Sequence, residues 1–556
     1  MLVDVVVDVG AWELDHPLTY SVPEKYADLI TLGSVVRVTL RNRPVRGWVV
    51  STDSLGGEPR EAMKILPIKS VSGKGPVFDA ALLEMARALA ARYVHPLSSF
   101  LSLFTPPRVG RPSKTMIAAA RTRKPAGRGG KALLMRLGAG EDAVKTYEEE
   151  IRRCLEGGSG AIVAVPEVRE GSVVLQRLAD ALPVDAAVVH SGLDPKERSD
   201  ALWEVGAGKR RLVLGGRAAM FAPPFDLGLI IVHNEHDRSF KDQRSPYVDA
   251  REAALQRGRA GGADVILASP TPSLASFAHF NRPEAFEEPD RAGERSRWPV
   301  VELVERTGAM VPRRAVAAII EARRRSAKTL VLLPRAQRSR AGPGPSEVAY
   351  FISRVVPDAK VSRVDRPSLG DEPGALGPAL EADVVVATEA ALAEIRRPEL
   401  GLVVALDIDA YLQRPSTTAV EEAFASLWSL GCLVAGKSPR GRMLIETDSP
   451  QHHLVQALTR GSFRYFAERE LAYRKEAEAP PFRSIVRLGV NGEVSGLMDR
   501  LQKLPGTTVL GPVPGGRLGT EFLLKAEDAG TLTGPLGTIV REAENRILVE
   551  MDPRDW

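Results

Sequence analysis

The chain has 556 residues, with 44% hydrophobic and 26% charged side chains and a formal net charge of +5 at pH 7. This length is too great for one hydrophobic core, so we expect about three to five domains of ordinary globular composition. No apolar run is long enough to cross a bilayer, and residues 1–4 lack the basic start of a secretory signal, so we expect a cytoplasmic protein without membrane contact.

Cysteine and histidine do not form a metal-binding pattern. The two cysteines, Cys154 and Cys432, lie far apart in sequence, and we expect buried thiols of a reducing compartment. The eight histidines include no H-E-x-x-H motif.

The first segment, residues 1–107, has the pattern of a small β-rich module. Residues 3–9 are rich in valine, and residues 35–40 and 45–50 are spaced to pair as a hairpin across 41–44. Residues 80–93 have helical periodicity, with Leu82, Met85, Leu89 and Tyr93 on one face.

Residues 108–131 form a basic segment with eight Lys or Arg and no acid, interrupted by Pro and Gly. Such a run is typical of a solvated linker. Because no acid offsets the charge, contact with a nucleic-acid backbone is an equal alternative, and the candidates include Arg121, Arg123 and Lys124.

From residue 132 to about 278, short apolar runs alternate with helical segments such as 143–155 and 173–182, which predicts βαβ units and a parallel sheet. A second set of apolar runs lies at 329–333, 360–364, 383–387, 402–406 and 442–446. Two α/β lobes in succession predict a cleft between them, and an α+β unit is expected over 479–556.

The stretch 227–241 begins as an apolar run and ends in ionisable residues, as expected where an open α/β sheet places a ligand. In many motor ATPases an Asp-Glu pair at this point holds the metal and the attacking water. This chain has His233 and Asn234 there, followed by Glu235, His236 and Asp237.

Five phrases of the central region identify a family resemblance. The phrases are 165–167 (VPE), 190–192 (HSG), 216–223 (GRAAMFAP), 235–241 (EHDRSFK) and 269–274 (SPTPSL). In this order and spacing they resemble PriA (primosomal protein N-prime), a family of bacterial replication restart proteins that are superfamily 2 DNA helicases. Residues 93–97, 510–514 and 549–553 extend the resemblance over most of the chain.

The resemblance implies a multidomain α/β fold. It predicts an N-terminal β-rich domain that binds a 3′ DNA end over 1–107, two RecA-like helicase lobes of the superfamily 2 type over 132–300 and 301–478, and a C-terminal α+β domain over 479–556. The family's winged helix is predicted missing or reduced to the basic linker 108–131.

The phosphate loop of the family has the form G-x-x-x-x-G-K-[ST], and this chain departs from it. Gly138 and Gly140 remain, but Glu141 stands at the lysine and Asp142 at the hydroxyl residue. Two carboxylates would repel a polyanion, whereas acids suit the first turn of a helix. We therefore predict that the nucleotide site is lost.

The two positions that bind the metal and the attacking water in the family are also altered in this chain. His233 replaces the Mg²⁺-binding Asp and Asn234 replaces a Glu, which leaves Glu235, His236 and Asp237 as remnants of the motif. Zinc binding by His233, His236 and Asp237 is disfavoured because neighbouring strand residues point to opposite faces and no fourth ligand is evident. We predict no catalytic residues and no metal.

The second lobe has lost the corresponding residues. The family's Q-x-x-G-R-x-G-R motif aligns with 430–438, where no Arg is placed to reach a γ-phosphate. The cysteine-rich zinc insertion should fall between Leu333 and Val348, and no Cys occurs there. We expect neither ATP with Mg²⁺ nor zinc as a cofactor.

The N-terminal module keeps part of the family's DNA-end site. Tyr20 and Lys64 match, Thr19 replaces an Asp, and Arg41 stands at a glycine. Tyr20 is predicted to stack a base and Lys64 to meet a phosphate, with a core tyrosine and a surface lysine as the alternative. Loss of the Asp weakens the expected selectivity for a free 3′ end.

These features predict a non-catalytic replication restart protein, associated with the nucleoid, that binds stalled or abandoned forks and helps to assemble the primosome. The expected partners are forked or single-stranded DNA, primosome proteins, the replicative helicase and single-stranded DNA-binding protein. One alternative is an active ATP-dependent 3′–5′ helicase with degenerate motifs. The other is a primosome adaptor that contacts only proteins.

Overall fold

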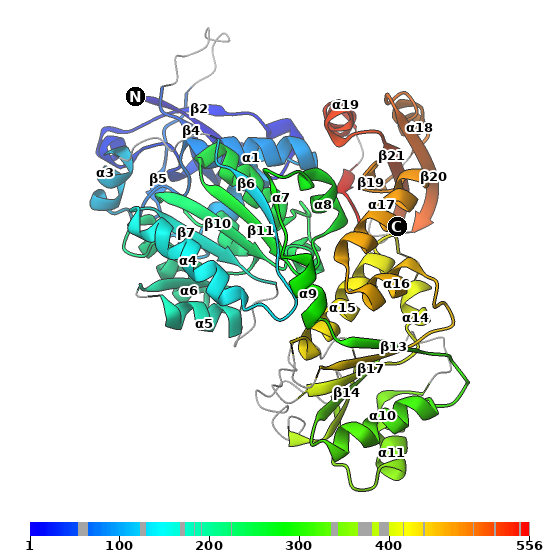
Figure 1. Ribbon diagram of the computed structural model, residues 1–556. Coiled ribbons are helices and arrows are strands. Elements are labelled where there is room, and N and C mark those ends of the chain that lie inside the picture. The colour runs from blue at the N-terminus through cyan, green and yellow to red at the C-terminus, as the bar shows by residue number, and fades with distance from the viewer. Residues whose placement is uncertain are drawn as a thin grey trace.

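The computed structural model describes most of the chain. The described residues are 1–53, 65–122, 129–166, 173–182, 184–190, 192–223, 225–334, 343–364, 381–388, 400–414, 416–436, 440–492, 494–515, 519–543 and 546–554. The fold is α/β, with two parallel sheets flanked by two antiparallel ones (Figure 1).

The N-terminal sheet is antiparallel and has five strands in the order β2-β1-β4-β3-β5. Its central hairpin turns on Arg41 and Asn42, whose φ values are 47° and 65°. This two-residue turn is tighter than the predicted one, so β4 begins at Arg43. The elements are β1 (Leu2–Val7), η1 (Trp12–Leu14), β2 (Leu18–Ser21), η2 (Glu24–Leu29), β3 (Val35–Leu40), β4 (Arg43–Ser51) and β5 (Ser70–Ser72).

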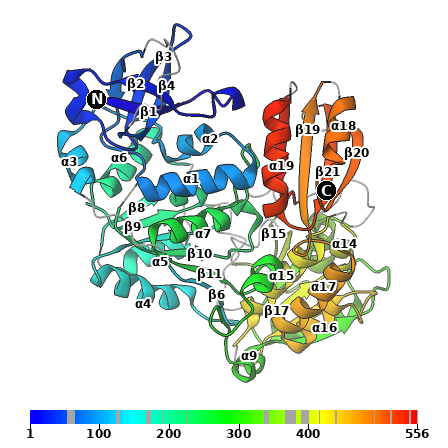
Figure 2. The same ribbon diagram turned by 90° about the horizontal axis from the view of Figure 1, so that it is seen from above.

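Helix α1 (Ala80–Tyr93) occupies the predicted residues and joins the N-terminal sheet to the rest of the molecule. Asp79 caps it by accepting a hydrogen bond from Leu82 N at 3.0 Å. Its buried face packs on α7 (Ala250–Gly261) and α19 (Ala529–Glu542), and Figure 2 shows α1 beside both. The short elements α2 (Leu97–Leu101), η3 (Ser102–Phe104) and α3 (Lys114–Thr122) follow.

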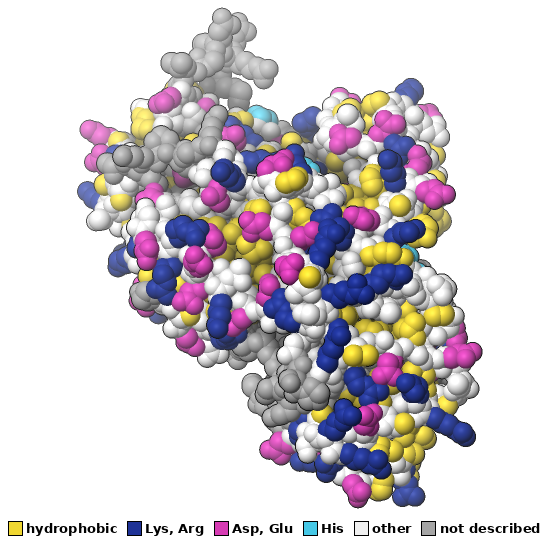
Figure 3. Space-filling model, viewed as in Figure 1, with side chains coloured by type: hydrophobic (Ala, Val, Ile, Leu, Met, Phe, Trp, Pro, Cys, Tyr) yellow, Lys and Arg dark blue, Asp and Glu magenta, His cyan; other side chains and the backbone are white. Residues whose placement is uncertain are grey.

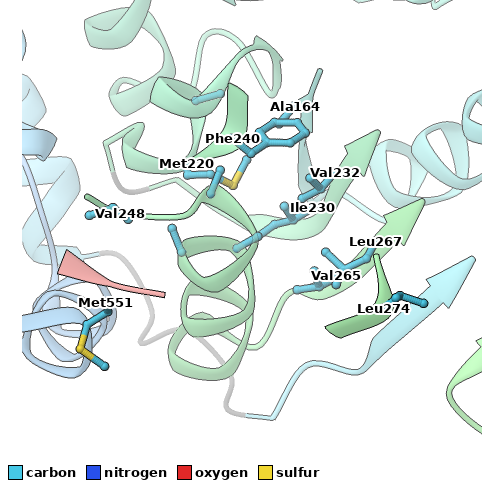
Figure 4. Close-up of a cluster of buried hydrophobic side chains, with 14 of the residues drawn as sticks. Ala164, Met220, Ile230, Val232, Phe240, Val248, Val265, Leu267, Leu274 and Met551 are labelled. Carbon is cyan, nitrogen blue, oxygen red and sulfur yellow. The ribbon is translucent and has the colours of Figure 1, made fainter. Parts of the chain in front are cut away.

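The first lobe contains a seven-stranded parallel sheet in the order β12-β6-β11-β10-β7-β9-β8. Strand β10 lies inside this sheet, and Ile230, Ile231 and Val232 are completely buried, as the apolar run predicts (Figure 4). The strands are β6 (Ala132–Arg136), β7 (Gly160–Ala164), β8 (Ala186–Val189), β9 (Leu212–Gly215), β10 (Leu227–His233), β11 (Asp264–Ser269) and β12 (Phe286–Glu287). The helices besides α7 are α4 (Ala143–Glu156), α5 (Val173–Ala181), α6 (Pro195–Gly206), η4 (Arg217–Phe221), η5 (Arg238–Phe240), α8 (Leu274–Phe280) and α9 (Arg291–Arg297).

The second lobe contains a six-stranded parallel sheet in the order β13-β18-β17-β14-β16-β15. The strands are β13 (Val300–Val304), β14 (Lys328–Leu333), β15 (Val361–Val364), β16 (Val384–Thr388), β17 (Leu400–Ala405) and β18 (Arg442–Glu446). The helices are α10 (Arg313–Arg324), α11 (Pro345–Val355), α14 (Asp409–Leu412), α15 (Ala419–Val434), α16 (His453–Arg460) and α17 (Phe463–Glu476). Edge strand β13 was not predicted because its half-exposed side chains do not form an apolar run.

The C-terminal unit is an antiparallel sheet in the order β20-β21-β19-β22, with helices α18 and α19. It consists of β19 (Ser484–Asn491), α18 (Ser495–Leu501), β20 (Thr507–Gly515), β21 (Gly519–Ala526), α19 and β22 (Arg546–Met551). In the described part of the chain, no helix is both long and apolar enough to cross a membrane.

Aromatic side chains join the two lobes. Trp298 follows α9, two residues before β13, and packs within the second lobe, where it stacks on Trp428 of α15 with ring centroids 4.1 Å apart and its Nε1 donates to Leu458 O at 2.7 Å. Phe277 of the first lobe meets Phe463 of the second edge to face at 5.4 Å. All four rings are 0–2% exposed. The lobes therefore share a continuous buried core.

Candidate nucleotide and DNA sites

The loop between β6 and α4 holds the remnant phosphate motif, and two of its backbone N–H groups bind carboxylates of the chain. Gly138 N donates to Glu141 Oε2 at 2.7 Å, and Ala139 N donates to Glu294 Oε1 at 3.1 Å. Gly140 keeps a left-handed φ of 77°, so the turn itself is formed. In a phosphate loop these N–H groups would point at the nucleotide. Here two carboxylates of the protein take the place of the anion.

Glu294 is held at the loop by Arg136, the last residue of β6. Arg136 Nη1 donates to Glu294 Oε1 at 2.9 Å, and the two side chains are each 3% exposed. The guanidinium also lies over Trp428 and Phe463, at 6.0 and 5.8 Å from the ring centroids. This ion pair could not be predicted from the sequence, because Arg136 and Glu294 are 158 residues apart and belong to no local motif.

Asp142 is the N-cap of helix α4, one residue before the first turn in which the acids were expected. Its carboxylate accepts from Val144 N at 3.1 Å, and Arg177 binds it through Nη1 at 3.1 Å. Hydrogen bonding by Arg177 lowers the pKa of Asp142. Arg297 lies 3.5 Å from Glu141. Both acids of the altered motif are therefore paired with arginines within the protein.

At the end of β10, His233 faces the protein interior. Its Nδ1 is 2.8 Å from the hydroxyl of Tyr147, and both residues are buried. Burial raises the pKa of Tyr147, so its hydroxyl is neutral. Asn234 adopts a left-handed φ of 52°, and among the described residues its Oδ1 has no hydrogen-bond partner.

Glu235 is fully buried and accepts several hydrogen bonds. Ser273 N donates at 2.5 Å, Ser276 Oγ at 2.9 Å and Arg251 Nη1 at 3.2 Å. Ser273 Oγ also donates, at 3.0 Å. Glu235 thus connects β10 with the start of α8 and with α7, and no oxygen of its carboxylate lacks a donor.

His236 and Asp237 have separate structural contacts. His236 Nδ1 is 2.7 Å from Ser269 Oγ, and Asp237 accepts from Ser239 N at 2.8 Å as the cap of η5. Among the described residues, no group of three or more His, Cys, Asp or Glu could hold a metal ion. Cys154 and Cys432 are free thiols, and each is partly buried.

The burial of His236 gives a pH-dependent stability. Burial lowers the pKa of His236, so the folded state favours the neutral ring. The resulting stability is complete above the unfolded pKa of about 6.5 and is lost as the pH falls below it, by at most about 1.4 kcal/mol per pH unit. In urea unfolding at pH 7.5 and 5.5, we expect wild type to lose more stability than His236→Gln. Equal losses would contradict this role.

The residues predicted to contact DNA differ in their exposure to solvent. Thr19 and Arg41 are exposed, and Thr19 Oγ1 donates to Asp4 at 2.8 Å. Tyr20 is 4% exposed and its hydroxyl donates to Thr39 O at 3.1 Å, so a base could stack on it only after the ring leaves the core. Arg121 Nη2 donates to Ile30 O at 2.9 Å. Lys64, Arg123 and Lys124 lie outside the described residues.

The loop geometry decides whether a nucleotide fits. A magnesium triphosphate needs free backbone donors, a cationic side chain and an oxygen ligand for the metal. The described loop instead presents donors bound to Glu141 and Glu294, and the end of β10 presents His233 bound to Tyr147. These residues do not fit a triphosphate, and no catalytic step can be derived through one.

Two parallel-sheet lobes with a remnant phosphate loop at their junction define a helicase-like protein of the RecA-lobed class. Residues 4–106 match the family of the PriA 3′ DNA-binding domain. The chain is 25% identical over 433 residues to the replication restart protein PriA of Bacillus subtilis, and the match covers 65% of this chain and 53% of that protein. The chain is therefore PriA-like.

The extent of the match differs among relatives. The chain is 24% identical over 575 residues to PriA of Treponema pallidum, covering 87% of this chain and 86% of that protein. It spans about half the length of the Bacillus subtilis relative. Among solved structures, RecG bound to a three-way DNA junction aligns over 66% of this chain and 45% of its own, with 16% identity and a TM-score of 0.41.

Proposed function

We propose that this protein acts in replication restart by binding stalled or abandoned forks, and that it does so without ATP hydrolysis. The match of residues 4–106 to a 3′ DNA-binding domain supports the fork-binding part. The observation that carries the second part is the loop at Gly138–Gly140, where carboxylates of the chain accept the hydrogen bonds that a phosphate would need.

Packing between the domains also supports a scaffold rather than a motor. A superfamily 2 motor must move its lobes during each cycle, whereas the Phe277–Phe463 contact between the lobes is buried. The C-terminal segment also forms hydrogen bonds with the residues that follow β10. Lys241 Nζ donates to Met551 O, and Arg554 Nη2 donates to Asp237 O at 3.3 Å. Separating the first lobe from the C-terminal unit would expose these groups.

We propose that DNA contact lies on the N-terminal module, with Thr19, Arg41 and Lys64 as candidates and Tyr20 available after a local rearrangement. Primosome proteins, the replicative helicase and single-stranded DNA-binding protein are the proposed partners. We place the protein in the cytoplasm at the nucleoid. No ATP, Mg²⁺ or zinc is required for this role.

The test measures fork binding and ATPase activity on one preparation. We expect fork DNA to bind at low salt, with an affinity that falls as salt rises, and no ATP turnover with or without DNA. Arg41→Glu should weaken fork binding about fivefold or more, while Arg324→Glu, an equally exposed charge reversal on the second lobe, should not.

Two experimental outcomes would contradict this proposal, and each favours a different alternative function. DNA-stimulated ATP turnover by wild type that a folded Glu235→Gln protein lacks would support an active helicase. Failure to bind fork DNA even at low salt would leave an adaptor that contacts only proteins.

A further inference from the structure

Helix α17 presents an aromatic and basic surface that the account above does not use. Its buried side includes Phe463, Phe466 and Arg474. On the opposite side, Tyr465, Arg469 and Tyr473 follow one another at intervals of four residues. Residues at this interval line one face of a helix and rise about 6 Å per step. We call Tyr465, Arg469, Tyr473 and Arg460 of α16 the α17 surface.

Tyr465 lies between two guanidinium groups. The Cζ atom of Arg460 is 4.6 Å from the centroid of its ring, and that of Arg469 is 5.6 Å away. Both arginines are exposed, and neither forms an ion pair with a carboxylate of the described residues. Figure 3 shows Lys and Arg side chains gathered over this part of the face.

Tyr473 extends the surface by a second ring. It is 55% exposed, and its inner edge meets His453 with ring centroids 5.2 Å apart. The ring of His453 stacks on that of Phe466 in the core at 5.8 Å, so Tyr473 is supported from below and open above. An exposed tyrosine with such support costs little entropy to order when a flat ligand stacks on it.

The charges on the α17 surface indicate which class of ligand it would bind. Glu468 lies on the same side but is 3.5 Å from Arg464, and Glu476 lies at the far end of the helix, next to Lys475. Arg460 donates to Gln456 O at 3.0 Å, and among the described residues neither arginine of the α17 surface has a carboxylate partner. Two guanidinium groups beside exposed aromatic rings favour a polyanion that also offers aromatic faces. Single-stranded nucleic acid has both properties, because its bases are unstacked and its phosphates follow at each step.

We propose that the α17 surface binds single-stranded DNA, with bases stacking at Tyr465 and Tyr473 and phosphates contacting Arg460 and Arg469. The site lies on the second lobe, apart from the N-terminal module that would hold a fork's 3′ end. The inference rests on the proposed function only in taking DNA as the ligand. It adds a second contact, for a single-stranded arm of the same fork.

The test is fluorescence anisotropy with a labelled oligothymidylate whose 3′ end is blocked by a phosphate. Wild type should bind it, and Tyr465→Ala/Arg469→Ala should weaken binding about tenfold or more. Loss of the two charges in Arg460→Gln/Arg469→Gln should make the plot of log K against log salt less steep by about 1.4. Tyr465→Phe keeps the ring and should bind as wild type does.

The matched control is Tyr350→Ala/Arg354→Ala on α11, an exposed tyrosine and arginine with the same spacing. It should leave binding unchanged. Equal affinities for wild type and Tyr465→Ala/Arg469→Ala would overturn the inference, as would no binding of the oligothymidylate at low salt. Binding of a fork that has no single-stranded arms tests the proposed function without involving the α17 surface. If such a fork binds while the oligothymidylate does not, the inference fails and the proposed function stands.

Discussion

Replacing Trp298 by alanine should lower the free energy of unfolding by about 3–5 kcal/mol, the usual cost of removing a buried tryptophan. The indole is 2% exposed, stacks on Trp428 and donates to Leu458 O. A Cβ atom added at Gly431 would lie 2.4 Å from its ring, so the surrounding chain is closely packed around it. Urea unfolding followed by circular dichroism measures the loss.

The matched control for this prediction is Tyr350→Ala, because Tyr350 is 69% exposed on α11. Surface substitutions of this kind usually change stability by less than about 0.5 kcal/mol. If the lobes share one core, wild type should unfold in one transition that moves as a whole in the Trp298 variant. A loss below about 1 kcal/mol would contradict the close packing of Trp298, and separate transitions for the two lobes in wild type would contradict the shared core.

Replacing Glu235 by alanine should also destabilise the fold, by about 3–5 kcal/mol. The carboxylate is fully buried, and its removal leaves the Ser273 N–H and the Ser276 hydroxyl without their acceptor, while Arg251 keeps only Asp249 as a carboxylate partner. Glu235→Gln, which keeps one acceptor oxygen, should lose less. Thermal unfolding of wild type, Glu235→Gln and Glu235→Ala measures their order of stability.

The same variants separate a structural role from a catalytic one. If Glu235 is structural, the ATPase background of wild type is already that of buffer, and Glu235→Gln leaves it there while lowering stability. If Glu235 served a motor, Glu235→Gln would remove a measurable rate. A stable Glu235→Gln protein with lost turnover would therefore refute the structural assignment.

Elements with a strong local pattern could be predicted from the sequence. Strand β10 is an uninterrupted apolar run, and α1 has a helical period with an aspartate cap, so both were expected at nearly their observed bounds. Glu141 and Asp142 were expected in the first turn of a helix, and they lie just before it, with Asp142 as the N-cap of α4. The α/β class followed from the alternation of such elements.

Contacts between distant residues could not be predicted in this way. Glu294 reaches the loop at Ala139 from α9, and Tyr147 reaches His233 from α4, because folding brings together segments with no shared motif. The burial of Tyr20 depends on the packing of the whole N-terminal sheet. The hairpin turn was predicted too long, since an arginine at positive φ is an unusual choice.

We propose that the loop around Gly140 has no place for a triphosphate. Isothermal titration calorimetry of magnesium ATP into the protein, alone and with fork DNA bound, tests it most directly. We predict no saturable heat in either titration, and the same for Glu141→Lys, because Glu294 still accepts the hydrogen bond from Ala139 N. Saturable one-to-one binding to wild type, lost on Gly140→Val, would contradict the claim.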